Sequence, residues 1–159
     1  MNKTLLVKKI IAHLTDKVAL HVGAAKAAHV EATHEESKAE DKYDTRGLEA
    51  SYLAAGQSKQ LEEMADALQQ FARMTVRKFQ PTEAIDLSAL VELETNEGRS
   101  LYFMGPSGGG TDVVHERKAV LVITPQSPLG RQLVGRKKGD RLKMKIGGSM
   151  NDYSVVSVA

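Results

Sequence analysis

The chain has 159 residues, with 22 Lys and Arg against 20 Asp and Glu, and no cysteine. This length allows one domain or two small ones, and the near balance of charge gives no global field that would favour wrapping a nucleic acid. With three Phe, four Tyr and no Trp, stacking of single-stranded bases is disfavoured. The absence of cysteine excludes disulfides and thiolate metal sites, and no apolar run approaches the length of a membrane span. A soluble cytoplasmic protein is therefore expected.

Residues 1 to 80 have the pattern of an antiparallel helical hairpin, a two-stranded coiled coil. Two segments carry apolar and small residues at alternating spacings of four and three. A polar cluster at 40–47 separates them, and we expect the turn within residues 41–47. Large side chains lie at the expected base of the hairpin and alanines near its tip. The two seams are Val7, Ile11, Leu14, Val18, His21, Ala25, Ala28 and Ala32, and Ala50, Ala54, Gln57, Leu61, Met64, Leu68 and Phe71.

Acidic residues crowd the expected tip of this hairpin. Residues 31 to 49 contain seven Asp and Glu against three Lys and Arg. Carboxylate oxygens are the ligands that Mg²⁺ selects, so the tip is a candidate for approaching a metal ion. The alternative interpretation is that these acids solvate a loop and that Asp44 only caps the second helix.

The pattern changes to period two beyond Pro81, which we expect to end the second helix. Alternating apolar residues at 89–94, 101–103 and 141–146, and the continuous apolar run 120–123, are typical of strands, the last one buried on both faces. We therefore expect a second domain at 84–159, a small and strongly bent antiparallel sheet with one short helix. The whole chain would belong to the α+β class.

The short helix is expected directly after Ile123. Ser127 has the side chain of an N-cap, and Pro128 suits the first helical position, where no N–H is needed. Leu129, Leu133 and Val134 would then form one apolar face. Two later glycines, Gly135 and Gly139, suit chain reversals that need positive φ.

Other motifs give no sign of an independent metal or cofactor site. His13, His21 and His29 are eight residues apart, so their side chains drift around a helix and cannot converge on one ion. The glycine-rich segment 105–111 lacks the Lys of a phosphate-binding loop, which favours a flexible hairpin loop. We expect no cofactor of the protein's own.

Two blocks of the sequence resemble the bacterial transcript-cleavage factors GreA and GreB. The first runs from about Ile123 to Val158 and contains Ser127-Pro128-Leu129-Gly130-Arg131, the turn at Gly139-Asp140 and a closing strand at 153–158. The second is the segment 49–55, which is similar to the Asn-Ala-Glu-Tyr-His-Ala-Ala segment of that family. The order of a helical hairpin followed by an FKBP-like sheet domain matches over essentially the whole chain.

The resemblance implies a monomeric accessory factor of bacterial RNA polymerase that is not itself an enzyme. In that family the C-terminal domain docks at the rim of the secondary channel and the hairpin passes down it, so contact with nascent RNA and DNA is indirect. Tip carboxylates help to hold a catalytic Mg²⁺ of the polymerase during cleavage of backtracked RNA. Carried over to this chain, the polymerase-binding residues are Ser127, Pro128, Leu129 and Arg131, the tip carboxylates are Asp41, Asp44 and Glu49, and the metal ligands are Asp44 and Glu49.

Two registers of the tip remain open. The segment Asp41 to Asp44 keeps the Asp-x-x-Glu spacing of the family, with Asp in place of Glu. Alternatively, Asp44 and Glu49 flank a lengthened tip. In either register Arg46 and Gly47 have no counterpart in the family pattern. Some relatives occupy the channel and inhibit transcription, so an inhibitory or modulating role is the alternative function.

Two other classes of protein are alternatives to a polymerase-binding factor. An FKBP-like sheet could belong to a peptidyl-prolyl isomerase, but those sites are lined by aromatic rings, and only Tyr102, Phe103 and Tyr153 are available here. A two-helix arm could also serve dimerisation alone. Molecular size in solution would separate that role from channel binding by a monomer.

Overall fold

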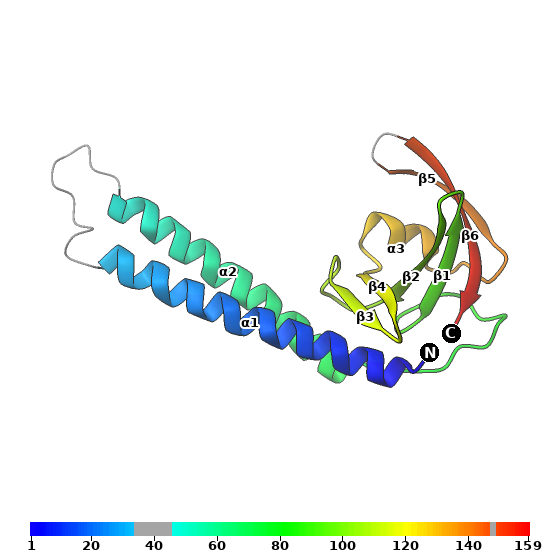
Figure 1. Ribbon diagram of the computed structural model, residues 1–159, viewed down its shortest axis with the longest axis horizontal. Helices are drawn as coiled ribbons and strands as arrows, with labels where there is room; N and C mark the ends of the chain where they lie inside the picture. The colour runs from blue at the N-terminus through cyan, green and yellow to red at the C-terminus, as the bar shows by residue number, and fades with distance from the viewer. Residues whose placement is uncertain (34–45, 147–148) are drawn as a thin grey trace. The chain divides into compact units, whose positions relative to one another are not determined.

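The computed structural model describes the backbone of residues 1–33, 46–146 and 149–159, and at some positions, among them 46–55, only the backbone. A pair of helices comes first and a mixed β-sheet with one short helix follows, which confirms the α+β class (Figure 1). The chain divides into two compact units, Met1–Ile11 with Gln70–Ala159, and Ala12–Gln69. The boundaries drawn from the sequence, 1–80 and 84–159, stay a prediction, because compactness alone does not show which part folds by itself.

Helix α1 spans Lys3–Thr33 and helix α2 spans Arg46–Arg73. Within the unit 12–69, Leu14 and Ala67 are buried, and Val18, Leu61 and Met64 are half-buried. Leu14, Val18, Leu61 and Met64 are positions of the predicted heptad seam. Ala67 is not one of them, but it is next to the seam residue Leu68. The alanines of the expected tip have side chains outside the described residues.

Both ends of α2 differ from the sequence-based expectation. The helix begins at Arg46, so Arg46 and Gly47 are helical and not part of the turn, whose other residues lie outside the described ranges. It ends at Arg73, six residues before Phe79, and not at Pro81. The physical reason is burial, because Phe79 is 8% exposed within the core of the sheet. The chain reaches this place as an extended segment.

The sheet has six strands in the order β3-β4-β2-β1-β6-β5. Their bounds are Leu90–Thr95 for β1, Gly98–Met104 for β2, Asp112–His115 for β3, Lys118–Ile123 for β4, Arg141–Ile146 for β5 and Ser149–Val158 for β6. All pairs are antiparallel except β2 with β4, which is parallel, so the sheet is mixed where we expected an antiparallel one. The cause is the edge hairpin β3–β4. The chain leaves β2, forms β3 at the edge and returns as β4 in the direction of β2.

Both faces of the sheet are covered. On one face, helix α3 (Pro128–Leu133) contributes Leu129 and Leu133 to a core that also contains Val91, Leu93 and Val155. On the other face lie Phe103, Val120 and Val122, all 0% exposed. A Cβ added to Gly105 would lie 2.8 Å from the Phe71 ring and 2.9 Å from the Val122 side chain, so the end of α2 packs on this second face.

The first turns of α1 are also buried on a side that the heptad pattern does not include. Lys3, Leu6 and Ile10 are spaced i, i+3 and i+7 and share one side of the helix, and each is at most 8% exposed. The amine of Lys3 donates a hydrogen bond to the Ser88 carbonyl at 3.1 Å. This side of the helix therefore lies against the β domain, the sheet-containing part of the chain at 84–159. The base of α1 therefore has two buried sides, one more than the seam predicts.

Candidate functional site

The segment with the strongest family resemblance folds into a tightly bonded turn at the start of α3. Ser127 accepts the N–H of Gly130 at 3.1 Å through Oγ, and the same hydroxyl donates to the Thr124 carbonyl at 2.7 Å. Pro128 occupies the first helical position. The predicted N-cap and N-terminal proline are both confirmed. Local hydrogen bonds hold the turn, so it presents its outer residues in a defined geometry.

Gly130 is required by this turn. A Cβ at this position would lie 1.8 Å from the Thr124 carbonyl oxygen and 2.8 Å from the Ser127 hydroxyl. No side chain other than hydrogen fits that space without a backbone shift. Part of the sequence block that resembles the family is thus explained by folding.

The four residues that we expected to bind a partner differ in solvent exposure: two are on the surface and two are not. Leu129 is 8% exposed and belongs to the core, and Ser127 is half-buried and occupied by the cap. Pro128 and Arg131 are exposed. Direct binding by Leu129 would require the core to open, so the two exposed residues are the candidates for contact. Their binding role stays a prediction.

The end of α3 differs from the expected apolar face. Leu129 and Leu133 are buried as predicted, but Val134 is the C-cap and is 42% exposed. Gly135 turns the chain away with φ of 84°, and its N–H donates to the Ile85 carbonyl at 2.9 Å. The tight reversal after Leu133 leaves the Val134 side chain on the surface.

A shallow cleft of about 400 Å³ adjoins this exposed valine, and the sequence pattern did not reveal it. Its lining combines Val134 and Ile85 with charged side chains. Arg77 lies 4.0 Å from Glu83 and 3.9 Å from Asp86, and each of the three side chains is more than a third exposed, so these pairs contribute little stability. The cleft extends the candidate surface from α3 onto the segment 83–86.

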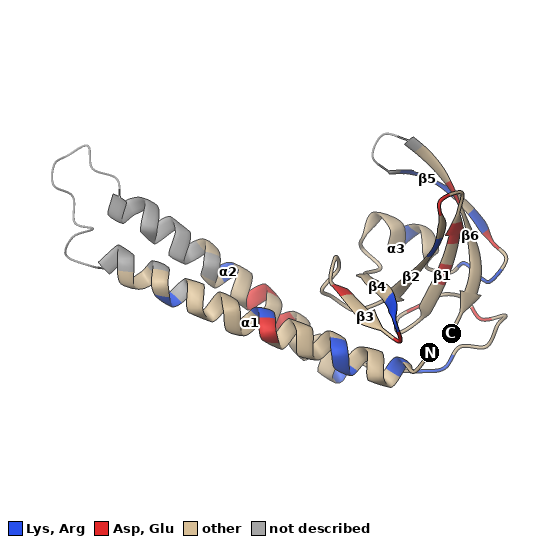
Figure 2. Cartoon of the chain, in the orientation of Figure 1, with Lys and Arg blue, Asp and Glu red and all other residues tan. Residues whose placement is uncertain are grey.

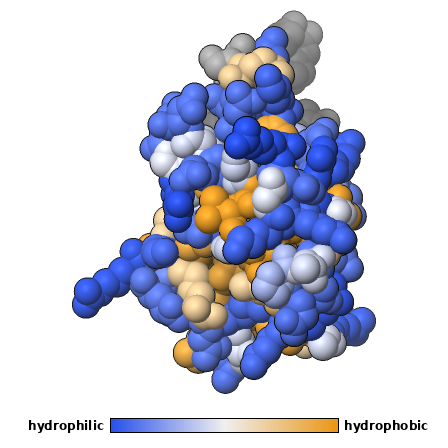
Figure 3. All heavy atoms as spheres, turned by 90° about the vertical axis from the view of Figure 1, so that its right-hand side faces the viewer, coloured by the Kyte–Doolittle hydropathy of each residue, from blue (hydrophilic) through white to orange (hydrophobic). Residues whose placement is uncertain are grey.

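Large apolar side chains on the surface are few, and they help to define where a partner could dock. In the β domain as described, they are Leu87, Val114, Val134 and Met150. Figure 3 shows one face of the molecule on which apolar surface gathers in the centre with hydrophilic residues around it. Apolar areas with a polar rim are typical of protein interaction sites.

The base of α1 is attached to the β domain by buried polar contacts. The Lys3 amine donates to the carbonyls of Arg77 and Ser88 and lies 4.8 Å from the centre of the Phe79 ring. The Arg77 guanidinium lies 4.2 Å from the same ring. Burial, with a smaller contribution from the charge of Arg77, lowers the pKa of Lys3 to about 8. These contacts fix the first turn of α1, and no sequence motif marked Lys3 as important.

A second attachment involves the turn between β3 and β4. The carboxylate of Glu116 accepts the N–H of Asn2 at 3.0 Å, and this bond is the main reason why the pKa of Glu116 is lowered. The amine of Lys9 donates to the Val114 carbonyl at 3.1 Å. The edge hairpin is thereby bonded to Asn2, just before α1, and to Lys9 in the second turn of that helix.

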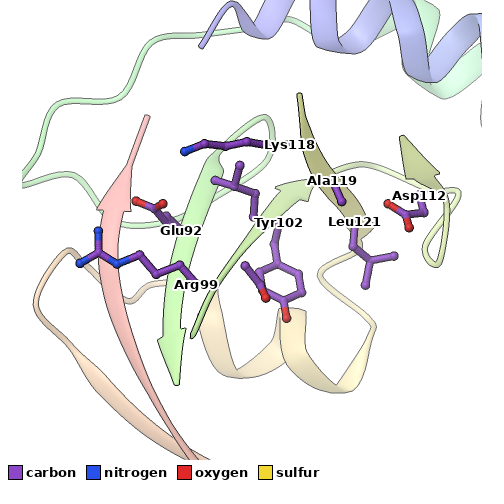
Figure 4. A pocket seen from close by; sticks show the side chains of 9 residues that line it. Glu92, Arg99, Tyr102, Asp112, Lys118, Ala119 and Leu121 are labelled. Atoms are coloured by element: carbon purple, nitrogen blue, oxygen red, sulfur yellow. The ribbon is translucent and has the colours of Figure 1, made fainter. Parts of the chain in front are cut away.

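An open pocket of about 620 Å³ is lined by residues of β1, β2, β3 and β4 (Figure 4). Glu92, Arg99, Asp112 and Lys118 surround it, and Tyr102 contributes the only ring to its lining. Of the other aromatic candidates, Phe103 and Tyr153 are buried. A lining with one ring and four charged groups does not have the chemistry of an aromatic-lined isomerase site.

The side chains of the carboxylates predicted for the hairpin tip are not among those that the structure describes. Asp41 and Asp44 lie outside them, and Glu49 is within α2 with only its backbone described. Within the described part of the chain, no group of three or more His, Cys, Asp or Glu is arranged to hold a metal ion. Over the same residues, none of the helices combines the length and apolar character needed to cross a membrane. The metal role of the tip therefore stays a prediction.

No family model and no curated protein matches the chain. Among solved structures, it is similar to the GreA factor homolog 1 (Gfh1) protein of Thermus thermophilus, with 19% identity, a TM-score of 0.38 and 94% of each chain covered. A structure described as the transcription factor Gfh1 gives 25% identity and a TM-score of 0.40, covering 95% of this chain and 94% of that one.

The elongation factor GreA/GreB from Nitrosomonas europaea gives 22% identity and a TM-score of 0.36, covering 60% of this chain and 78% of that one. All three TM-scores are below 0.5. These superpositions therefore add no argument about function, which has to rest on the residues themselves.

Proposed function

We propose that this protein is an accessory factor of bacterial RNA polymerase that binds at the secondary channel and stimulates cleavage of backtracked RNA. The β domain docks at the rim of the channel through α3 and its neighbouring cleft. The helical hairpin enters the channel with its acidic tip foremost. The protein acts in the cytoplasm and has no catalytic activity of its own. As a partner of the polymerase it meets nascent RNA and DNA indirectly, within the elongation complex.

The observation that supports docking is the exposure of Pro128 and Arg131 within an otherwise internally bonded turn. Ser127, Leu129 and Gly130 have structural reasons for their identity, namely the cap, the core and the close approach to Thr124. Pro128 favours the turn but remains exposed, and the Arg131 side chain makes no hydrogen bond or ion pair with the described residues. Arg131 belongs to the block that resembles the family and has no such structural reason for its identity, so its side chain is available to bind a partner.

The reaction would use the polymerase's own Mg²⁺, which activates water and stabilises charge on the phosphate being cleaved. The carboxylates of Asp44 and of Asp41 or Glu49 would supply further oxygen ligands to that ion. Carboxylate oxygens are suitable for this purpose because Mg²⁺ prefers hard oxygen donors. The protein thus contributes negative charge and would hold its carboxylates at the place where the ion binds.

An inhibitory factor that occupies the channel without stimulating cleavage is the second candidate. It is favoured by the start of α2 at Arg46, which puts a cationic residue type in the first turn, between the possible ligands Asp44 and Glu49. A positive charge at a helix N-terminus opposes the binding of another cation. Such a tip would be less suited to holding Mg²⁺ than to filling the channel.

Transcript cleavage by a stalled, backtracked polymerase tests both candidates in one assay. The main proposal expects faster cleavage on addition of the protein and competition with a known channel-binding factor. The inhibitory alternative expects the same competition, with slower elongation and no added cleavage. Absence of competition at high excess would contradict both, because each of them requires occupancy of the channel.

A further inference from the structure

The outer edge of the sheet carries a concentration of positive charge that the proposed function does not use. The segment 136–145 contains six Lys and Arg and one acid, in a chain whose net charge is only +2. We call this surface the basic edge, and its cations are Arg136, Lys137, Lys138, Arg141, Lys143 and Lys145. Five of them are exposed and Arg136 is half-buried. Figure 2 shows basic residues along β5 and the loop before it.

The acids near this surface do not neutralise it. Asp140 is half-buried and its carboxylate accepts the N–H of Lys137 at 2.9 Å, so it is engaged inside the loop. Asp152 on β6 lies 3.7 Å from the amine of Lys143, but both side chains are about 70% exposed (74% and 69%). An ion pair so well solvated is weak. The basic edge therefore keeps a large positive excess.

The cations on β5 form a regular row. Arg141, Lys143 and Lys145 alternate with the buried Leu142 and the half-buried Met144, so they project from one face of the strand. Alternate residues of a strand are about 6.8 Å apart. Duplex DNA carries a phosphate charge every ~3.4 Å of helix axis on each strand, so a regular row of cations is complementary in charge to the regular row of phosphates. Since β5 is the last strand in the sheet order, no other strand of the described residues pairs with its outer side.

We propose that the basic edge binds the phosphate backbone of duplex DNA directly. Single-stranded nucleic acid is a poorer fit, because stacking needs exposed aromatic rings and the segment 136–145 has none. Within the segment 136–145, Leu142 is buried and Met144 is half-buried, so the segment has no exposed apolar side chain to anchor an acidic protein, which is also a poorer fit. Contacts to phosphates alone would give binding without sequence preference. This proposal goes beyond the polymerase-binding function and does not rest on it.

A simpler explanation accounts for part of the pattern only. Lysines on an edge strand prevent pairing with a strand of another molecule, and Lys143 and Lys145 would serve that purpose. This explanation does not apply to Arg136 and Lys138, which precede the strand in a loop. Duplex binding explains the loop and the strand together.

The test measures binding of the full chain to a short DNA duplex over a salt series. If three of these cations contact phosphates, the slope of log K against log salt is about −2.7, a loss of ~40-fold between about 50 and 200 mM salt. The variant K138Q/K143Q/K145Q should lose most of this binding and flatten the slope. The control K8Q/K26Q/K59Q removes the same charge from exposed helix positions and should bind like the unmodified protein.

Glutamine on the edge strand β5 could also lower DNA binding by promoting self-association of the protein. Two further measurements distinguish this effect from the loss of phosphate contacts. The charge-preserving variant K138R/K143R/K145R should restore binding, and R136Q/R141Q, which leaves the strand lysines in place, should weaken it. Equal loss in the helix control and in K138Q/K143Q/K145Q would overturn the proposal. Stronger binding to polyglutamate than to the duplex at the same salt would overturn it as well. Neither outcome bears on the cleavage assay, since no polymerase is present.

Discussion

Gly130 lies directly against the backbone carbonyl of Thr124, so that a Cβ on Gly130 would be 1.8 Å from that oxygen and 2.7 Å from its carbon. The contact joins the end of β4 to the first turn of α3. It explains why a glycine follows Leu129 in the segment with the strongest family resemblance. It also makes the turn unusually sensitive to substitution.

The substitution Gly130→Ala should destabilise the β domain by more than about 2 kcal/mol, because backbone must move to relieve the overlap. Urea unfolding measures the change. Gly109→Ala is the matched control, since its Cβ would meet only ordinary contacts with Thr124 at 3.4 Å or more. Equal stability of the two variants would mean that the turn relaxes without cost.

Ser127→Ala should destabilise the protein by about 1 kcal/mol through loss of the N-cap. Ser127→Thr keeps a hydroxyl that can accept from Gly130 and donate to Thr124, so it should cost less than half as much. Both changes are measurable as shifts in the urea midpoint at constant slope. A threonine variant as unstable as the alanine variant would show that the two hydroxyl bonds are not what stabilises the turn.

Arg131→Glu should weaken binding to RNA polymerase by ~10-fold or more while leaving the free energy of unfolding within about 0.5 kcal/mol, as is usual for exposed positions. Competition with a channel-binding factor gives the affinity. Arg117→Glu, in the exposed turn between β3 and β4, makes the same charge change and serves as control. If the control weakens binding equally, net charge and not the α3 surface determines affinity.

Asp44→Asn should reduce cleavage stimulation sharply with little change in polymerase binding, because asparagine removes the anionic ligand. Asparagine caps a helix almost as well as aspartate. A merely structural Asp44 would therefore tolerate the change in every assay. Comparing Asp41→Asn with Glu49→Gln would then identify the second carboxylate and decide the register of the tip.

Lys3 should make stability depend on pH in a definite direction. Its pKa is about 8 in the folded protein against 10.5 ordinarily, so the unfolded chain binds more protons between these values. Stability then rises with pH from about 8 to 10.5, by at most ~1.4 kcal/mol per pH unit for one proton. The neutral amine still has two N–H groups for the carbonyls of Arg77 and Ser88.

The Lys3→Met variant isolates this contribution from the other groups that titrate at high pH. The difference in unfolding free energy between the unmodified protein and Lys3→Met should shift in favour of the unmodified protein as pH rises through this window. Below pH 8 the difference should be constant. A difference that is flat from pH 7 to 10.5 would show that Lys3 keeps its ordinary pKa.

The sequence by itself determined those features that depend on neighbouring residues. The heptad spacing indicated two helices, Ser127 and Pro128 indicated the start of α3, and Gly135 and Gly139 have positive φ as predicted, at 84° and 93°. Each of these depends on interactions within a few residues of the chain. The basic character of 136–145 is likewise visible in the sequence, but its placement on an edge strand is not.

Tertiary structure decided everything that depends on packing between distant segments. The helix α2 ends at Arg73 because Phe79 is buried in the core of the sheet, which the chain reaches in an extended conformation. The β domain covers Leu6 and Ile10, which lie beside the heptad seam. The insertion of β4 between β3 and β2 makes one strand pair parallel. Periodicity in one segment contains no information about which partner will cover it, because burial depends on surfaces far away in the sequence.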